Sequence, residues 1–182
     1  YPIDWNDAWD VQAVREIAHP LWSGMNGTLD FPFGCDDESL GGVPCERIRT
    51  NRSSQSAVIL HMHGGMYCLG TPEIDRVLNA PLSKATGLDV VSVDYRLAPE
   101  YPFPGAIDDV MAVWRALTTT NRQLIVVGES AGGGLAAAAV TRRSAPAHPA
   151  LLPPPPSRGA ARPRAPRRGQ RHAQRHASCG AR

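Results

Sequence analysis

The sequence predicts an α/β fold with a doubly wound, mostly parallel β-sheet. Three short and continuous apolar runs, at residues 56–62, 88–93 and 123–127, have the pattern of strands that are covered on both faces. Helical patterns of apolar residues fall between and after these runs. Strands that alternate with helices in this way are typical of a doubly wound sheet.

The three helical patterns of this region differ in how well they are delimited. Residues 104–117 keep helical spacing over three turns, and Pro104 suits the first turn. Another helix is expected over residues 130–142. The pattern at residues 73–86 contains Pro81, which should kink or split it. In this last segment we expect five apolar residues to face the core: Ile74, Val77, Leu78, Leu82 and Ala85.

The N-terminal part of the chain predicts one further helix. Four apolar residues have the i, i+3, i+4, i+7 spacing of an inward helical face: Val14, Ile17, Ala18 and Leu21. Pro20 predicts that this helix ends near residues 18–19. Residues 24–42 are rich in Gly and Asp and are expected to form a loop, and residues 43–49 could form an edge strand.

Charge is distributed unevenly along the chain, although the net charge is only +2. All 17 acidic residues lie at or before Glu129, and all ten Lys and Arg residues beyond that point belong to the last 41 residues. Residues 143–182 contain no acidic, aromatic, Ile or Val residue. Such a segment buries too little apolar surface to offset the entropy of ordering, so we expect a disordered C-terminal tail.

The origin of this tail has two interpretations. A GC-rich gene that is read out of frame after codon 142 yields Ala, Arg, Pro, Gly and Ser, which is the composition of the tail. The alternative is a genuine basic segment that binds an acidic partner or nucleic acid. No sequence-specific nucleic-acid binding is expected, although a basic tail could bind anions non-specifically.

Nothing in the composition indicates a membrane span or export. No apolar run approaches the roughly 20 residues that cross a bilayer, and the start of the chain is acidic and polar rather than a signal peptide. The four cysteines show neither close pairing nor metal-ligand spacing, so we expect free thiols and a cytoplasmic location. No metal and no organic cofactor are expected.

The most informative local signal is the segment at residues 124–134, Leu-Ile-Val-Val-Gly-Glu-Ser-Ala-Gly-Gly-Gly. A strand, a sharp turn with Ser130 and a helix form a nucleophile elbow, which is typical of acyl transfer through a serine ester. Gly128 and Gly132 fit the elbow because side chains there would collide with the neighbouring strand and helix. The elbow therefore predicts Ser130 as a nucleophile.

A second motif, His63-Gly64-Gly65, directly follows the apolar run at residues 56–62. Tandem glycines at this place let backbone N–H groups point into a cleft, where they can stabilise a developing oxyanion. The two neighbouring histidines, His61 and His63, are expected to have structural roles.

A third motif covers residues 94–100, Asp-Tyr-Arg-Leu-Ala-Pro-Glu, at the end of the second apolar run. Arg96 is expected to pair with Glu100 or another nearby carboxylate and to fix this loop under the site. We interpret Asp94, Arg96 and Glu100 as structural support rather than as catalytic residues.

Together, the three motifs resemble the signatures of the hormone-sensitive-lipase-like family of α/β-hydrolases and occur in the same order. By this resemblance, residues 41–142 would be the N-terminal part of the hydrolase domain, residues 1–40 part of its cap region, and residues 143–182 a separate tail. The resemblance implies hydrolysis of a small-molecule carboxylic ester with Ser130 as the nucleophile. It assigns the oxyanion hole to three backbone N–H groups: those of Gly64, Gly65 and Ala131. Six residues would support the site: His63, Asp94, Arg96, Glu100, Gly128 and Gly132.

Two members of the family's catalytic triad are missing at their expected places. The triad acid and histidine follow the serine along the chain. No Asp or Glu follows Glu129, and the three histidines of the tail lack the family's flanking sequence. We therefore expect a hydrolase that is truncated after the nucleophile helix, with weak or no turnover. Two alternatives stay open: a non-catalytic remnant whose basic tail binds an anionic partner, and an amidase or deacetylase on the same scaffold.

Overall fold

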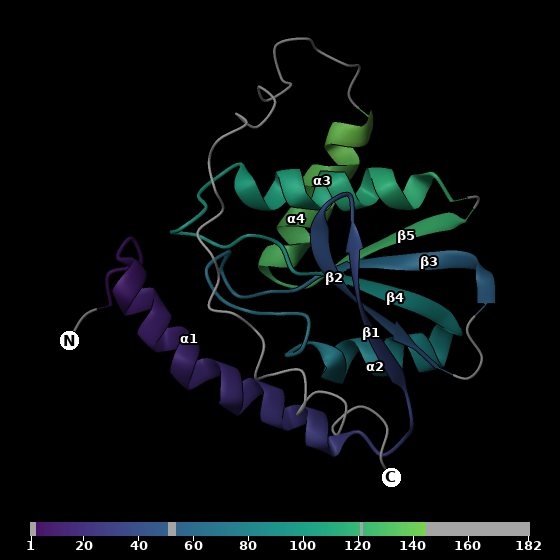
Figure 1. The fold of residues 1–182 in the computed structure, drawn as a ribbon, viewed down its shortest axis with the longest axis horizontal. Helices are drawn as coiled ribbons and strands as arrows, with labels where there is room; N and C mark the ends of the chain where they lie inside the picture. Colours follow the sequence, from purple (N-terminus) through teal and green to yellow (C-terminus); the bar gives the residue numbers. More distant parts are fainter. Residues whose placement is uncertain (1–2, 51–53, 121, 145–182) are drawn as a thin grey trace.

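The computed structural model describes residues 3–50, 54–120 and 122–144, which form one five-stranded sheet with helices on both faces (Figure 1). The helices are α1 (Ala8–Ser23), the short 3-10 helix η1 (Gly24–Thr28), α2 (Arg76–Thr86), α3 (Gly105–Thr118) and α4 (Ala131–Ser144). The strands are β1 (Gly34–Leu40), β2 (Val43–Arg49), β3 (Ser54–Met62), β4 (Leu88–Val93) and β5 (Gln123–Gly128). Strands and helices thus alternate as predicted.

The three predicted apolar strands form the parallel half of the sheet. The strand order is β1-β2-β4-β3-β5, and β3 is parallel to both β4 and β5. The prediction that residues 43–49 form an edge strand is wrong, because β2 lies between β1 and β4 and pairs antiparallel with both. Since parallel strands end at the same edge, the segments after β3, β4 and β5 gather at one end of the sheet.

The first strand, β1, lies in the segment that was expected to be a loop. Its sequence, Gly-Cys-Asp-Asp-Glu-Ser-Leu, has no apolar alternation, and none of its residues is fully buried. Gly41 and Gly42 connect β1 to β2 with φ angles of 59° and 81°. Two successive positive φ angles are typical of a two-residue hairpin turn, so this Gly-Gly pair is the signal that identifies the hairpin.

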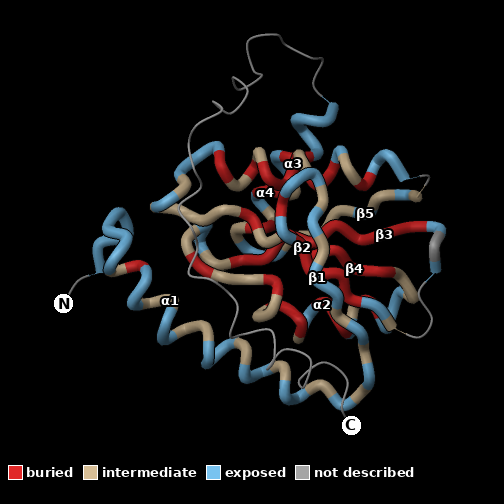
Figure 2. Tube along the Cα trace, viewed as in Figure 1, coloured by how far each residue is buried: buried red, intermediate tan, exposed pale blue. Residues whose placement is uncertain are grey.

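Two apolar clusters cover the two faces of the sheet, because successive side chains of a strand point to opposite faces. Val58 and Leu60 of β3 belong to the cluster that includes Val113 of α3. Ile59, between them, belongs to the cluster that includes Ala80 of α2. Figure 2 shows that burial is concentrated in the central strands and in the helix sides that face them.

Helix α1 continues beyond its predicted end near residues 18–19. It begins after Asp7, whose side chain accepts a hydrogen bond from the N–H of Trp9 at 2.8 Å, as an N-cap residue does. Pro20 lies inside the helix and is exposed. The helix ends instead before Gly24, whose N–H donates to the carbonyl oxygen of Pro20.

The inward face of α1 also differs from the prediction. Two of the four residues expected to face inward are 67% and 68% exposed: Ile17 and Leu21. Val11 is the buried residue of α1, and polar contacts also hold the helix. Nε of Arg15 donates to the carbonyl oxygen of Cys68 at 2.8 Å, and Nη1 contacts Oε1 of Glu100 at 2.6 Å. These contacts to distant loops orient the helix, and most of its surface stays exposed (Figure 2).

The inward face of α2 is polar rather than apolar. Its buried residues are Arg76, Asn79, Ala80 and Ser83, and Pro81 lies inside the helix without splitting it. Nη2 of Arg76 donates to Oε2 of Glu46 at 2.5 Å, and Oγ of Ser83 donates to the carbonyl oxygen of Leu88 at 2.8 Å. The prediction of an apolar inward face is therefore wrong for Leu78 and Ala85, whereas Leu82 packs against the apolar cluster that includes Ala80. Of the residues expected there, Leu78 and Ala85 are exposed and Ile74, Val77 and Leu82 are half-buried.

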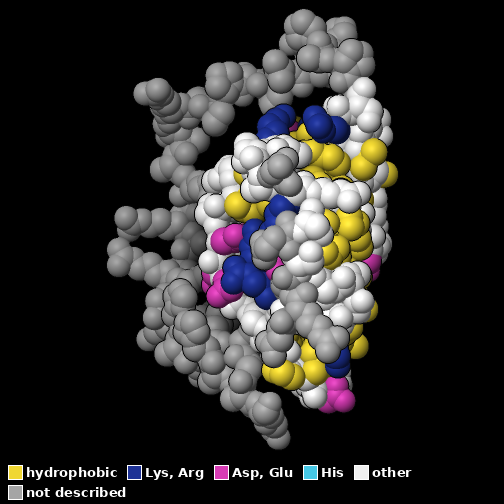
Figure 3. Space-filling view, turned by 90° about the vertical axis from the view of Figure 1, so that its right-hand side faces the viewer, with side chains coloured by type: hydrophobic (Ala, Val, Ile, Leu, Met, Phe, Trp, Pro, Cys, Tyr) yellow, Lys and Arg dark blue, Asp and Glu magenta, His cyan; other side chains and the backbone are white. Residues whose placement is uncertain are grey.

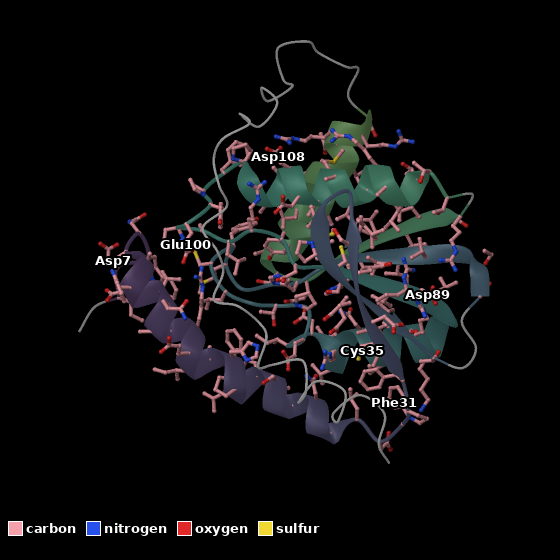
Figure 4. The ribbon with its side chains drawn as sticks, in the orientation of Figure 1. Asp7, Phe31, Cys35, Asp89, Glu100 and Asp108 are labelled. Carbon is pink, nitrogen blue, oxygen red and sulfur yellow. The ribbon has the colours of Figure 1, made fainter. Side chains whose placement is uncertain are left out.

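The end of the sheet at which β4 begins carries a cluster of charged side chains around Asp89. Oδ2 of Asp89 lies 3.2 Å from Nη1 of Arg47 and 3.4 Å from Nη1 of Arg122. Figure 3 looks onto this side of the molecule, where basic and acidic side chains lie next to one another. In Figure 4, Asp89 and Glu100 lie at opposite ends of the sheet, so this cluster is remote from the loops that follow the parallel strands.

Three remaining expectations concern cysteines, membranes and the tail. Cys45 and Cys68 are free thiols as expected, whereas Cys35 is disulfide-bonded, so the expectation is wrong for that residue. In the part of the chain that the structure describes, no helix combines the length and apolar character needed to cross a bilayer. Helix α4 includes residues 143–144, which were expected in the tail, and residues 145–182 lie outside the described residues.

Candidate active site

Ser130 lies in a sharp turn between β5 and α4, at the end of the sheet where the parallel strands finish. Its φ angle is +50°, a conformation that is uncommon for a residue with a side chain. Such backbone strain persists where the surrounding structure imposes it, and it is frequent at functional sites. Ser130 is exposed, so its hydroxyl is accessible.

Two glycines leave the room that this turn needs. A Cβ atom on Gly128 would overlap the Gly132 carbonyl and lie 2.8 Å from the backbone nitrogen of Gly133. A Cβ atom on Gly132 would overlap the Met62 carbonyl and lie 2.7 Å from the carbonyl oxygen of His63. The start of α4 therefore packs directly onto the end of β3, and this contact is the collision that the sequence predicted.

Strand pairing brings the loop after β3 beside the elbow. Met62 is paired with Gly128 in the β3–β5 ladder, and the N–H of Glu129 lies 3.4 Å from the carbonyl oxygen of Met62. The two segments that leave the sheet here are therefore the His63-Gly64-Gly65 loop and the elbow with Ser130. The structure thus brings together the first and third motifs.

The loop after β3 contains several residues with a positive φ angle. Gly65 has a φ of 113°, and the non-glycine residues Met66 and Tyr67 have φ angles of 56° and 63°. The carbonyl oxygen of Gly65 accepts hydrogen bonds from the N–H groups of Cys68 and Leu69 at 3.0 and 2.8 Å. These contacts fold residues 65–69 into a compact turn.

The candidate donors of an oxyanion hole are available. Within the described residues, the N–H groups of Gly64 and Gly65 donate no hydrogen bond. Ala131 is the first residue of α4, and the N–H of a first helical residue has no acceptor within the helix. The positive end of the helix dipole at this place favours an anion.

His63 is a structural residue at the base of this loop. Its ring is stacked on Tyr95 with the centroids 4.1 Å apart, and the Tyr95 hydroxyl donates to the carbonyl oxygen of His63 at 2.7 Å. Nδ1 lies 2.8 Å from the carbonyl oxygen of Gly64, which can only accept, so Nδ1 carries the proton. Burial lowers the pKa of His63 to about 4, so the ring is neutral at pH 7.

Glu129, within the elbow, also lies against the loop. Its carboxylate is so close to Gly64 that a Cβ atom on Gly64 would overlap it. A larger residue at position 64 would therefore require the Glu129 side chain to move. Glu129 stands immediately before the nucleophile, although the sequence assigned it no role.

Three buried polar side chains lie beneath the loop, between α2 and the sheet: His61, Asp75 and Asn79. Asn79 Nδ2 lies 3.2 Å from Nδ1 of His61, so that Nδ1 accepts and the His61 proton is on Nε2. Nε2 is 3.8 Å from Oδ2 of Asp75, which is too far for a hydrogen bond. Burial lowers the pKa of His61 to about 4. Burial, and secondly the negative charge of Glu129, raise the pKa of Asp75 to about 7.

The raised pKa of Asp75 predicts a specific pH dependence of stability. A folded-state pKa of about 7, against an ordinary value of 3.8, gives a stabilising contribution that is complete below pH 3.8 and lost as the pH rises through about 7. Asp75→Asn removes the buried negative charge. We expect this change to stabilise the protein by about 2 kcal/mol more at pH 8 than at pH 5, measured by urea unfolding.

The effects of His61 and His63 run in the opposite direction. The contribution of the two neutral rings to the stability of the protein is complete above pH 6.5 and is lost as the pH falls through about 4. These two histidine contributions are present in both the parent and Asp75→Asn, so they cancel when the two proteins are compared. Asp36→Asn in β1, where the carboxylate is exposed, is the matched control. A stability difference for Asp75→Asn that is the same at pH 5 and pH 8 would contradict the assignment.

In the third motif, residues 94–100, Arg96 and Glu100 each pair with a residue outside the motif. Arg96 does not pair with Glu100: its Nη2 contacts Oδ1 of Asp109 at 2.8 Å, and its backbone N–H donates to Oδ2 of the same carboxylate at 3.0 Å. Glu100 pairs instead with Arg15 of α1. The alternative of another nearby carboxylate is therefore the correct one for Arg96. Asp94 directly follows β4, and its N–H donates to the carbonyl oxygen of Pro44 at 3.0 Å.

The described part of the chain contains three histidines, and each has partners away from Ser130. His61 and His63 are buried as described above, and His19 lies 3.7 Å from Glu73. The sequence missed several side chains that shape the site: Arg15, Tyr67, Tyr95, Asp109 and Glu129. Glu129 lies inside the elbow motif and Tyr95 inside the third motif, so their positions were visible, but their contacts were not.

The chain matches the family model of the alpha/beta hydrolase fold over residues 59–178. It is 34% identical over 115 residues to an acetyl-hydrolase of Streptomyces hygroscopicus, covering 63% of this chain and 38% of that protein. It is 42% identical over 78 residues to an esterase of Acinetobacter venetianus, covering 43% of this chain and 25% of that protein. The chain thus spans well under half the length of these curated relatives.

Solved structures show the same relationship. A hormone-sensitive lipase from a metagenome library superposes with a TM-score of 0.61 at 37% identity, covering 72% of this chain and 48% of that one. An esterase from the bacterial hormone-sensitive lipase family superposes with a TM-score of 0.64 at 31% identity, covering 75% of this chain and 52% of that one. The chain therefore belongs to the α/β-hydrolase family and is similar, within it, to the hormone-sensitive lipase group, as the three motifs predicted.

Proposed function

We propose that this chain carries the nucleophile part of a serine carboxylic ester hydrolase, in which Ser130 attacks a small-molecule ester. The observation that supports this most directly is the strained φ of +50° at Ser130, in a strand–turn–helix beside the glycine loop after β3. Relatives that are named esterase and acetyl-hydrolase support an ester as the bond that is cleaved.

The proposed oxyanion hole consists of the backbone N–H groups of Gly64, Gly65 and Ala131. The first two donate no hydrogen bond within the described residues, and the third opens α4. A donor of this kind contributes about 3–4 kcal/mol to transition-state stabilisation in other serine hydrolases. Six residues support the site without touching the reacting atoms in this proposal: His63, Asp94, Arg96, Glu100, Gly128 and Gly132.

The proposed reaction lacks an assigned base. In acylation, a bond forms between Oγ of Ser130 and the carbonyl carbon, the bond to the alcohol oxygen breaks, and the serine proton is transferred through a base to the departing alcohol. Each described histidine has partners elsewhere, and no acidic residue follows Glu129 in the sequence. We therefore propose that a base outside the described residues takes this proton, and that the described part alone turns over slowly. Oxyanion stabilisation and binding alone still leave a residual acceleration of about 10³–10⁴ over water in a related system.

Covalent labelling tests the nucleophile without requiring turnover. A fluorophosphonate should label the chain once, as seen by intact mass, and Ser130→Ala should abolish that label. Ser144→Ala, at the far end of the same helix, is the matched control and should label like the parent. Labelling of Ser130→Ala at the same measurable rate as the parent would refute Ser130 as the nucleophile. Serine-dependent hydrolysis of p-nitrophenyl acetate at a typical enzyme rate of about 10 s⁻¹ would refute slow turnover.

The division of the chain into residues 1–40, 41–142 and 143–182 stays a proposal as well. The DNA sequence of the gene tests its last boundary. An alternative reading frame beyond codon 142 that encodes apolar strands and an Asp…His pair would support a frameshift. If neither alternative frame encodes them, the tail is a genuine basic segment.

A further inference from the structure

A groove runs along α4 from the position of the nucleophile. Gly134, Ala138 and Arg142 line it, and they follow Ser130 at i+4, i+8 and i+12. Residues spaced by four lie on the same side of a helix, about 6 Å apart along its axis. The lining of the groove therefore begins about one turn beyond Ser130, which does not line it, and turns around the helix by about 80° between Gly134 and Arg142.

The groove has the size and the lining of a small-molecule site. Its volume is about 490 Å³, within the range of about 300–1,000 Å³ for ligand pockets. Met66 and Tyr67 of the glycine loop form one wall, and Phe103 and Ile107, before and within α3, form another. Phe103 is 84% exposed, so the groove offers apolar surface that nothing in the described residues covers.

The two arginines that line the groove are already paired with carboxylates. Nη1 of Arg142 contacts Oδ1 of Asp108 at 3.0 Å, and Nη2 of Arg96 contacts Oδ1 of Asp109 at 2.8 Å. Asp108 is labelled in Figure 4, on the outer side of α3. A guanidinium that has its own carboxylate attracts a further anion weakly. The groove is therefore suited to a neutral, apolar group rather than to a carboxylate or phosphate.

Tyr67 and Gly134 meet at the end of the groove nearest the nucleophile. A Cβ atom on Gly134 would lie 2.5 Å from the Tyr67 hydroxyl oxygen, so the tyrosine occupies the space that a larger helical residue would fill. Glycine inside a helix is destabilising by roughly 0.5–1 kcal/mol relative to alanine, and this contact explains its use here. The backbone of Tyr67 is fixed by its φ of 63° and by its carbonyl oxygen, which accepts from the N–H of Ala98 at 2.9 Å.

From these observations we infer that the groove along α4 binds the neutral apolar arm of the ester held at Ser130, with Tyr67 and Ala138 as specificity-determining residues. This inference rests on the proposed function, because it places the ester carbonyl at Ser130. The apolar arm could be the acyl chain or the alcohol chain, which share the same chemistry. Two kinds of measurement test the inference separately from hydrolysis.

The first measurement is binding, in a chain that cannot react. Octanamide, a neutral and non-hydrolysable probe, is titrated onto Ser130→Ala with ¹³C-labelled methionine methyl groups. We expect the Met66 methyl resonance to shift while that of Met25, on the distant η1 helix, does not. Adding Ala138→Trp should weaken this binding at least tenfold. Ala137→Trp, exposed on the same helix but outside the groove, should leave it within twofold.

The second measurement distinguishes the two arms of the ester. Ethyl p-nitrophenyl octylphosphonate carries its long chain at the acyl position, and octyl p-nitrophenyl methylphosphonate carries it at the alcohol position. With either reagent the Ser130 oxygen forms a bond to phosphorus, p-nitrophenolate leaves, and the serine proton passes to water. Ala138→Trp should slow labelling by one of them at least tenfold relative to Ala137→Trp, and that reagent identifies the arm.

The outcomes separate this inference from the proposed function. If Ser130 is labelled but Ala138→Trp and Ala137→Trp behave alike with both reagents, the groove inference is wrong and the function stands. An unchanged Met66 resonance would also overturn it. If octanamide binds as expected but no reagent labels Ser130, the groove binds apolar groups and the proposed function fails.

Discussion

Replacing Gly132 by alanine is expected to lower the free energy of unfolding by about 3 kcal/mol or more, and to abolish labelling of Ser130. The added methyl carbon would lie 2.6 Å from the carbonyl carbon of Met62 and 2.7 Å from the carbonyl oxygen of His63. Both contacts are with backbone, which cannot rotate away as a side chain can. Helix α4 would have to move off β3, and Ser130 would move with it away from the glycine loop.

Gly133→Ala is the matched control for this prediction. It adds the same methyl group one residue further along α4, where the nearest atom is the carbonyl oxygen of Gly128 at 3.4 Å. Alanine is favoured over glycine inside a helix by up to about 1 kcal/mol, so this variant should be as stable as the parent or more stable. Urea unfolding of both variants measures the difference. If Gly132→Ala is as stable as Gly133→Ala, the close packing of α4 on β3 is wrong.

Removing the arginine of the buried Arg76–Glu46 pair is expected to destabilise the protein by about 3–5 kcal/mol. Only 6% of Arg76 and 3% of Glu46 are exposed, and Nε and Nη2 of the arginine donate to both carboxylate oxygens. In Arg76→Met, the Glu46 carboxylate would remain buried without a positive partner. The loss comes from this unpaired charge and should be visible in urea unfolding at pH 7.

Two comparisons make this prediction sharp. Arg49→Met removes an exposed partner of Asp36, with 49% and 58% of the side chains accessible, and should change stability by less than about 1 kcal/mol. The double variant Arg76→Met with Glu46→Leu removes both charges and should recover most of the loss, since a buried pair is often replaceable by apolar groups. An Arg76→Met chain that is no less stable than Arg49→Met would show that Glu46 is not buried as a charge.

β3 and β4 were predictable because most of their side chains are buried on both faces of the sheet. β5 was predictable from its continuous apolar run, although it is an edge strand of the described sheet and Ile125 is 37% exposed. β4 has the predicted bounds, and β3 and β5 differ from the predicted runs by at most two residues. A strand such as β1 carries no such signal, because pairing with β2 rather than burial holds it in the sheet. Its identification depends on the Gly41-Gly42 turn, a local conformational requirement instead of an apolar pattern.

Helices α1 and α2 show where apolar periodicity fails as a guide. Both are held to the molecule by polar side chains with distant partners: Arg15 with Glu100, and Arg76 with Glu46. Those partners are separated by tens of residues, so no local window contains them. The spacing of apolar residues then predicts the presence of the helix, but not the side that it turns inward.

The candidate site also contains features that the local sequence predicts and features that depend on distant residues. The glycines around Ser130 were predictable because the elbow is a recognisable local motif, although Gly132 makes its close contact with the distant Met62 and His63. The partner of Arg96 was not, because the choice between Glu100 and Asp109 depends on how α3 leaves the loop. The groove along α4 was also invisible in the sequence, since its walls come from three separate segments.

The pairing of Met62 with Gly128 has a consequence for how this protein can vary. Ser130 follows β5 and the glycine loop follows β3. The register of the β3–β5 pairing therefore sets how far Ser130 and the loop are displaced from each other along the strands. A slip of one residue would displace one against the other by about 3.3 Å and turn every side chain of the strand to the opposite face. Insertions or deletions inside β3 or β5 would therefore change the site from a distance. Insertions in the loops at the other end of the sheet would leave the β3–β5 register unchanged.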